Sequence, residues 1–145
     1  LEKSEAAFAY LQRNADHIAP ANTHLQLGDL MGGFQSFDFP TPQVIVSNPP
    51  YIRSAEISGL QQEVQREPRM ALDGGEDGLL FYRVLTERWI PFLSMDGLIA
   101  VECGEGQADE ISAIFQKEGL HTCSYLDYGE IDRIVTGGRP TGAIG

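Results

Sequence analysis

Two short apolar runs, each ending on a polar residue, most constrain how this chain can fold. They span residues 43–47, QVIVS, and 98–103, LIAVEC. A continuous apolar run of this length is typical of a strand that is buried on both faces of a parallel sheet. Amphipathic stretches predict helices at 78–93 and 106–119, and Gly119 suits the end of the second helix. We therefore expect an α/β sheet that is covered by helices on both of its faces.

Other segments complete this arrangement. Ser4 can cap a helix over 5–17, in which apolar residues recur at helical spacing. A short alternating strand is predicted at 24–29. The strands predicted at 121–128 and 132–138 are expected to form an antiparallel pair.

The middle of the chain is polar before it becomes amphipathic. Residues 52–77 are rich in Glu, Gln, Arg and Gly and are long for a connector. Long connectors over a sheet edge often act as lids. In the helix predicted to follow, the residues expected to share one apolar face are Leu80, Val84, Ile90 and Leu93.

The composition narrows the class of protein. The 145 residues suit one domain, and the 42% of apolar residues is enough for a packed core. The net charge of −11, with only 10 scattered basic residues, argues against binding through neutralised phosphates. Cys103, Cys123 and the histidines lack metal-ligand spacing, so we expect no metal site and free thiols, as in a cytosolic protein. No apolar run reaches the ~18 residues of a membrane-spanning helix.

Polar residues follow three of the predicted strands. They are Asp29, Asn48 and Glu102. Ligands of open α/β sheets bind outside the carboxyl ends of the strands. If these strands are parallel, the three side chains lie on one rim, and the sequence predicts a site there.

Asn48, Pro49, Pro50 and Tyr51 carry the most specific chemistry of this rim. The prolines have no N–H, and the side-chain oxygen of Asn48 and the carbonyl of Pro49 can together accept two hydrogen bonds from a planar NH₂ group. Tyr51 can offer a flat face for stacking on that group. Stiff prolines would hold the acceptors in place before a ligand arrives. On these four residues alone, a plain turn that ends a strand is an equally good interpretation.

The wider sequence resembles one enzyme family. The segment VIVSNPPYI resembles the (D/N/S)PP(Y/F) motif of class I S-adenosylmethionine-dependent amino-methyltransferases. Within that group, EVQREPRMALDGGEDGLLFYRVL, LIAVECGEGQ and DYGEIDRIVTGGR are similar to the protein-(glutamine-N5) methyltransferases that modify peptide release factors. The likeness runs from Glu2 to about Arg139. It implies a Rossmann-like sheet that is mostly parallel and ends in a C-terminal antiparallel hairpin.

The resemblance also implies roles for individual residues. Glu2 matches the acidic residue that binds the ribose hydroxyls of S-adenosylmethionine, although the family more often has Asp there. Asp29 matches the acid near the adenine, and Leu30 matches an adenine-side contact. Asn48 and Pro49 match the catalytic pair that orients the substrate amide, and Asn48 also lies close to the cofactor. Pro50 and Tyr51 complete the substrate-binding motif.

Part of the family's catalytic domain is not in this sequence. The first strand, the glycine-rich loop that follows it and a small N-terminal helical domain have no counterpart before Leu1. We therefore expect residues 1–140 to be the C-terminal part of a methyltransferase catalytic domain, present here as a fragment or a part of a longer chain. Residues 141–145 form a tail of uncertain origin that resembles the end of the glycine-rich loop, either by chance or as a displaced segment.

The resemblance implies methylation of the side-chain amide of glutamine in the GGQ motif of peptide chain release factors, with S-adenosylmethionine as cofactor. We expect a cytoplasmic monomer whose partner is the release factor, with no direct nucleic-acid contact and no membrane association. One alternative is an amino-methyltransferase of adenine or guanine in DNA or RNA, which would need a flipped base and a basic track. Another is a binding module that does not use the cofactor.

Overall fold

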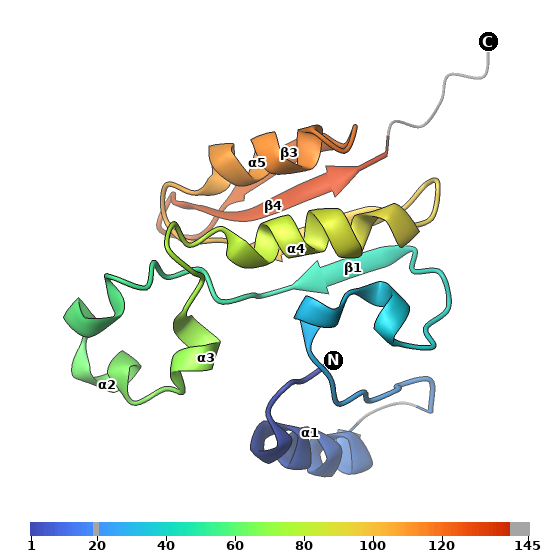
Figure 1. Ribbon diagram of the computed structural model, residues 1–145, viewed down its shortest axis with the longest axis horizontal. Coiled ribbons are helices and arrows are strands. Elements are labelled where there is room, and N and C mark those ends of the chain that lie inside the picture. Colours follow the sequence, from blue (N-terminus) through green and yellow to red (C-terminus); the bar gives the residue numbers. More distant parts are fainter. Residues whose placement is uncertain (19–20, 140–145) are drawn as a thin grey trace.

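The computed structural model describes residues 1–18 and 21–139 of the chain. Its helices are α1 (Glu5–Ile18), α2 (Gln62–Gln65), α3 (Arg69–Leu72), α4 (Leu80–Arg88) and α5 (Ala108–Gln116) (Figure 1). Its strands are β1 (Val44–Ser47), β2 (Leu98–Glu102), β3 (His121–Leu126) and β4 (Asp132–Gly138). The tail at 141–145, for which a displaced segment was one interpretation, lies outside the described residues.

The four strands form one sheet in the order β1-β2-β4-β3. β1 and β2 are parallel, and β4 is antiparallel to both β2 and β3. β3 therefore runs in the same direction as β1 and β2, so three of the four strands share one direction. The predicted α/β sheet with a C-terminal antiparallel hairpin is confirmed, and among the described strands the parallel pair is β1 and β2.

The core lies on the face of the sheet that α4 and α5 cover (Figure 1). Ile99 and Val101 of β2 and Val135 of β4 are fully buried there. They pack with the buried residues of the two helices, among them Tyr82, Leu85, Ile111 and Phe115. This contiguous apolar cluster is the packed core that the composition predicted.

The opposite face of the sheet differs from the prediction. Val44 and Val46 are 56% and 77% exposed, and Leu98, which pairs with Val44, is 41% exposed. Side chains alternate between the two faces of a strand, so these residues point away from the helices. Among the described residues, this face is therefore uncovered, and burial on both faces is wrong for β1 and the start of β2.

Local signals placed most helix boundaries correctly. In α1, the backbone N–H of Ala7 donates to Ser4 Oγ over 3.3 Å, as expected of a capping serine. The predicted helix 78–93 ends at Arg88, and a separate 3₁₀ turn follows at Ile90–Phe92. This turn contains Pro91, which has no N–H to continue the α-helical ladder. Leu80, expected in the apolar face, is exposed, and α4 instead buries Tyr82, Val84, Leu85 and Thr86.

The predicted strand at 24–29 is wrong. Among residues 1–18 and 21–139, its only ladder contact is an isolated parallel bridge between Glu2 and Leu27, and Leu27 is exposed. The segment after it is joined to α4 by a bond from Trp89 Nε1 to the carbonyl of Leu30, 2.9 Å long. The N-terminal part of the chain is therefore attached mainly at its 3₁₀ turns. In the part of the chain that the structure describes, no helix is long and apolar enough to cross a membrane.

Candidate active site at the carboxyl end of β1

The Asn48–Tyr51 segment leaves the sheet where β1 ends, beside the carboxyl end of the parallel strand β2. Asn48 is exposed, whereas Pro49 is buried. Among the described residues, neither the Asn48 side chain nor the Pro49 carbonyl has a hydrogen-bond partner. The two predicted acceptors therefore keep their capacity to accept hydrogen bonds.

Tyr51 is fixed by the end of β2. Its hydroxyl donates to Glu102 Oε1 over 3.3 Å, and the hydroxyl of the buried Tyr82 donates to the backbone carbonyl of Glu102 over 2.8 Å. Burial, and next the charge of Glu102, raise the pKa of Tyr51 above its usual value, so the ring stays neutral. Glu102, predicted at the rim, thus contributes by orienting the aromatic ring of the motif.

A second set of bonds holds the backbone after the prolines. Ile52 N donates to the carbonyl of Leu72 over 3.0 Å, and Gly74 N donates to the carbonyl of Ile52 over 2.8 Å. Ser54 N donates to the carbonyl of Gly75 over 2.9 Å. These bonds pair the two ends of the long connector and close it into a loop.

Glycines allow this close approach. A Cβ on Gly74 would lie 2.8 Å from Tyr51 Cα and 2.9 Å from the carbonyl oxygen of Pro50. A Cβ on Gly78, where φ is +77°, would lie 2.5 Å from the carbonyl oxygen of Tyr51. Sequence reasoning linked this glycine run to the site only through family resemblance. Its physical role is to let the 74–78 backbone lie against the motif.

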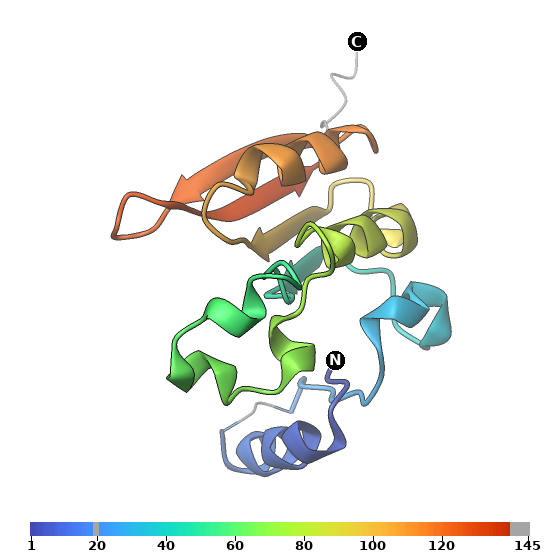
Figure 2. The same ribbon diagram turned by 60° about the vertical axis from the view of Figure 1, so that its left-hand side comes forward.

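The connector at 52–77 projects away from the sheet and carries α2 and α3 (Figure 2). Its lid role stays a prediction.

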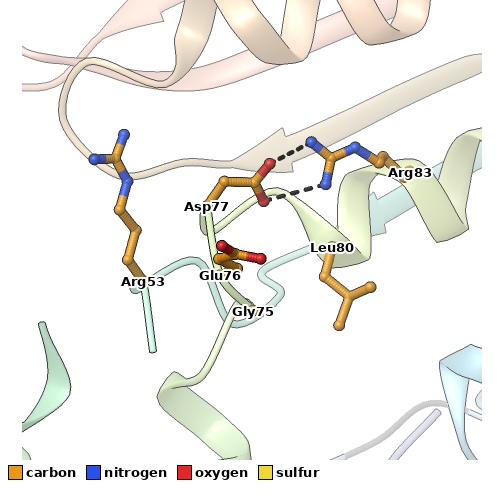
Figure 3. Close-up of a pocket in the computed structure, with 6 residues that line it drawn as sticks. All are labelled: Arg53, Gly75, Glu76, Asp77, Leu80 and Arg83. Carbon is orange, nitrogen blue, oxygen red and sulfur yellow. Dashed lines mark hydrogen bonds and ion pairs between the residues drawn. The ribbon is translucent and has the colours of Figure 1, made fainter. Parts of the chain in front are cut away.

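At the base of the connector lies an open pocket of about 640 Å³ that is lined by Arg53, Gly75, Glu76, Asp77, Leu80 and Arg83 (Figure 3). The Arg83 guanidinium donates two hydrogen bonds to Asp77, and with the backbone N–H of Leu79 it lowers the pKa of Asp77 to about 2. The pair anchors the start of α4.

Three of the four residues predicted to bind the cofactor lie near the N-terminus of the chain; they are Glu2, Asp29 and Leu30. Glu2 N donates to the carbonyl of Gln26 over 3.0 Å, which brings Glu2 close to Asp29 and Leu30. Lys3 Nζ lies 2.7 Å from Asp29 Oδ2. Burial alone would raise the pKa of Asp29, but hydrogen bonds from Lys3 and from the backbone N–H of Met31 lower it, so the carboxylate is charged.

That Asp29 shares one rim with Asn48 and Glu102 stays a prediction. Asn48 and Glu102 end neighbouring parallel strands, but Asp29 follows no strand of this sheet, since its segment makes only the bridge at Leu27. No hydrogen bond or ion pair among the described residues joins Glu2, Asp29 or Leu30 to Asn48.

Comparison with known proteins finds relatives of this chain. The chain is 43% identical over 143 residues to "Release factor glutamine methyltransferase" of Geobacter sulfurreducens, covering 96% of this chain and 48% of that protein. It is 37% identical over 137 residues to the protein of the same name in Thermodesulfovibrio yellowstonii, covering 93% and 48%. This chain is a relative of the release factor glutamine methyltransferases. The predicted resemblance is confirmed, and the chain spans about half the length of the curated relatives it matches.

The chain was also compared with protein-family models and with solved structures. No protein-family model matches the chain. Among solved structures, a protein-(glutamine-N5) methyltransferase (release factor-specific) from Alicyclobacillus acidocaldarius is 27% identical and aligns with a TM-score of 0.44, covering 67% of this chain and 48% of that one.

Proposed function

We propose that the protein carrying this chain transfers a methyl group to the side-chain amide nitrogen of a glutamine, namely that of the GGQ motif in peptide chain release factors. One observation carries the proposal. Asn48 Oδ1 and the Pro49 carbonyl are acceptors without partners among the described residues. Tyr51, at the other end of the same segment, is bonded to Glu102. The names of the relatives support the choice of a glutamine amide over other planar NH₂ groups.

The chemistry of the amide explains why two acceptors are useful. An amide nitrogen is a weak nucleophile because its lone pair is delocalised into the carbonyl. Asn48 Oδ1 and the Pro49 carbonyl would each accept one of its two hydrogens, which favours a pyramidal nitrogen and aims the lone pair away from them. As the N–CH₃ bond forms and the S–CH₃ bond of the donor breaks, the nitrogen would lose one of these two protons to solvent. Pro50 keeps the acceptors stiff, and Tyr51 would stack on the amide plane. Acceptors fixed in advance need no reorganisation during the reaction.

S-adenosylmethionine is the methyl donor that we infer, and when bound it supplies a methyl group on a positively charged sulfur. Glu2, Asp29, Leu30 and Asn48 are the residues that would hold it. They fit in part. Glu2 Oε1 already accepts from Ser4 N over 2.7 Å, which leaves Oε2 without a partner among the described residues for a ribose hydroxyl. The charged, part-buried Asp29 retains lone pairs that can accept from an amino group.

The charge of the chain fits this substrate class. A net charge of −11 favours a positively charged protein partner over a phosphate backbone. We propose a cytoplasmic enzyme that acts as a monomer on this partner.

The test uses the complete natural protein, S-adenosylmethionine labelled in its methyl group, and a release factor. We expect label on the wild-type factor and none on its GGQ variant in which Gln is replaced by Ala. Label on that variant, or on nucleic acid alone, would contradict the proposal and favour an amino-methyltransferase of bases.

A further inference from the structure

A buried glutamine lies at the start of α5, next to the amide site. Gln107 is only 7% exposed, and its side chain makes three hydrogen bonds to three separate segments. Nε2 donates to the carbonyl of Tyr51 over 3.0 Å and to that of Gly78 over 3.4 Å, while Oε1 accepts from Gly104 N over 2.9 Å. A buried amide with both ends satisfied fixes the segments that it joins.

The surrounding glycines make room for this side chain. A Cβ on Gly78 would lie 2.6 Å from Gln107 Nε2, and a Cβ on Gly104 would lie 2.9 Å from Gln107 Oε1. The same Cβ on Gly104 would lie 3.1 Å from Tyr51 Cδ2. Gln107 and Tyr51 therefore occupy space that exists only because both positions are glycine.

We infer that Gln107 is a positioning residue of the amide site, which holds the Tyr51 carbonyl and thereby the acceptors at Asn48 and Pro49; this rests on the proposed function. Gln107 touches neither acceptor. It acts through Tyr51, which is joined to Pro49 by Pro50, whose fixed φ makes the link stiff. Glu102 accepts from the hydroxyl of Tyr51 and fixes its ring, whereas Gln107 donates to the carbonyl of Tyr51 and fixes its backbone.

Two substitutions separate positioning from ordinary packing. Gln107→Leu removes all three bonds and keeps a similar volume. In Gln107→Glu, the charged carboxylate cannot donate to the Tyr51 carbonyl, whereas the protonated carboxyl can donate there and still accept from Gly104 N. Gln116→Leu and Gln116→Glu are matched controls on the same helix, since Gln116 is exposed and bonds only to Thr122 Oγ1 among the described residues.

Steady-state methylation of the release factor by the complete protein is the first measurement. Small displacements of reacting groups are costly, so we expect kcat to fall about 10- to 100-fold in Gln107→Leu, while KM for S-adenosylmethionine changes less than about 2-fold. The control variants should match wild type. A wild-type kcat, or a loss that disappears once the folded fraction is corrected for, would overturn the inference.

The Gln107→Glu variant adds a readout that a packing role would not move. Its kcat, divided by that of wild type at the same pH, should rise as the pH falls and the carboxyl becomes protonated. The titratable groups that interact with Tyr51 are shared by both proteins, so they cancel in the ratio; they are Glu102, Cys103 and Arg133. A ratio that stays flat from pH 8 to pH 5 argues against positioning.

The two proposals fail in different ways. If wild type does not methylate the release factor, the proposed function is wrong whatever the variants do. Positioning is then decided by nuclear magnetic resonance of the side-chain NH₂ of Asn48. Shifted or broadened signals in Gln107→Leu, but not in Gln116→Leu, support it, and unchanged signals overturn it.

Discussion

The Asn48–Tyr51 motif and the group formed by Glu2, Asp29 and Leu30 are held in different ways. Tyr51, the last residue of the motif, packs against the hydrophobic core and is bonded to Glu102 and Gln107. The second group is tied by one bridge, one exposed ion pair and one bond from Trp89, and the adjoining helix α1 has no buried residue. Both sets of bonds join residues far apart in the sequence. At Tyr51 they come from the part-buried Glu102 and the buried Gln107, whereas the second group is held in part by an exposed ion pair.

The largest effect on kcat is expected of Asn48→Ala. It removes one of the two acceptors, and the loss of one preorganised hydrogen-bonding group typically costs about 10²- to 10³-fold in kcat. The loss in kcat is measured by methylation of the release factor, with Asn14→Ala on the exposed face of α1 as control. A loss below about 5-fold would show that Asn48 is not one of the two acceptors and would contradict the proposed amide site.

Gly78→Ala tests how tightly the motif is held. Its Cβ would meet the Tyr51 carbonyl oxygen at 2.5 Å, and φ is +77°, so we expect a loss of about 2–4 kcal/mol in the free energy of unfolding. Gly119→Ala is the control, because φ there is +76° but nothing lies within 4 Å. It should cost only the backbone strain of about 1–2 kcal/mol. Equal losses in urea denaturation would mean that the close contact has no energetic weight.

Asp29→Asn probes the second group. The change keeps an oxygen that can accept from Met31 N but removes the charge that pairs with Lys3. We expect the Kd for S-adenosylmethionine to rise about 10-fold, equivalent to about 1.4 kcal/mol, with kcat nearly unchanged. Calorimetry measures the affinity, and the exposed Asp38→Asn serves as control. A fall in kcat without a change in affinity would assign Asp29 to the chemical step instead.

The smallest expected effect concerns Asp77 at the base of the connector. Its pKa is lowered to about 2, so its contribution to stability is present above the unfolded value near 3.8 and is lost as the pH falls toward 2. The carboxylate is 47% exposed, so solvent screening limits the effect to less than about 1 kcal/mol. Urea denaturation at pH 6 and pH 3 should show a smaller acid-induced loss in Asp77→Asn than in wild type. The exposed Asp16→Asn should behave as wild type does, and the same loss in both variants would contradict the assignment.

Local sequence signals determined a large part of this protein. Continuous apolar runs predicted β1 and β2, although one face of β1 is exposed, and Ser4 marked the start of α1. Two prolines after β1 ended the strand and predicted free acceptors beside Asn48, because proline has no N–H and adopts one φ.

Only the tertiary structure decided what holds those acceptors. The bonds of Gln107 reach 56 residues back to Tyr51 and 29 residues back to Gly78, and no local pattern reports a partner so far along the chain. The same reason explains the errors. The segment 24–29 alternates like a strand but finds one bridge, and Leu80 suits an apolar face but is rotated away from the core. Burial depends on what lies opposite a side chain, which the order of residues along the chain does not state.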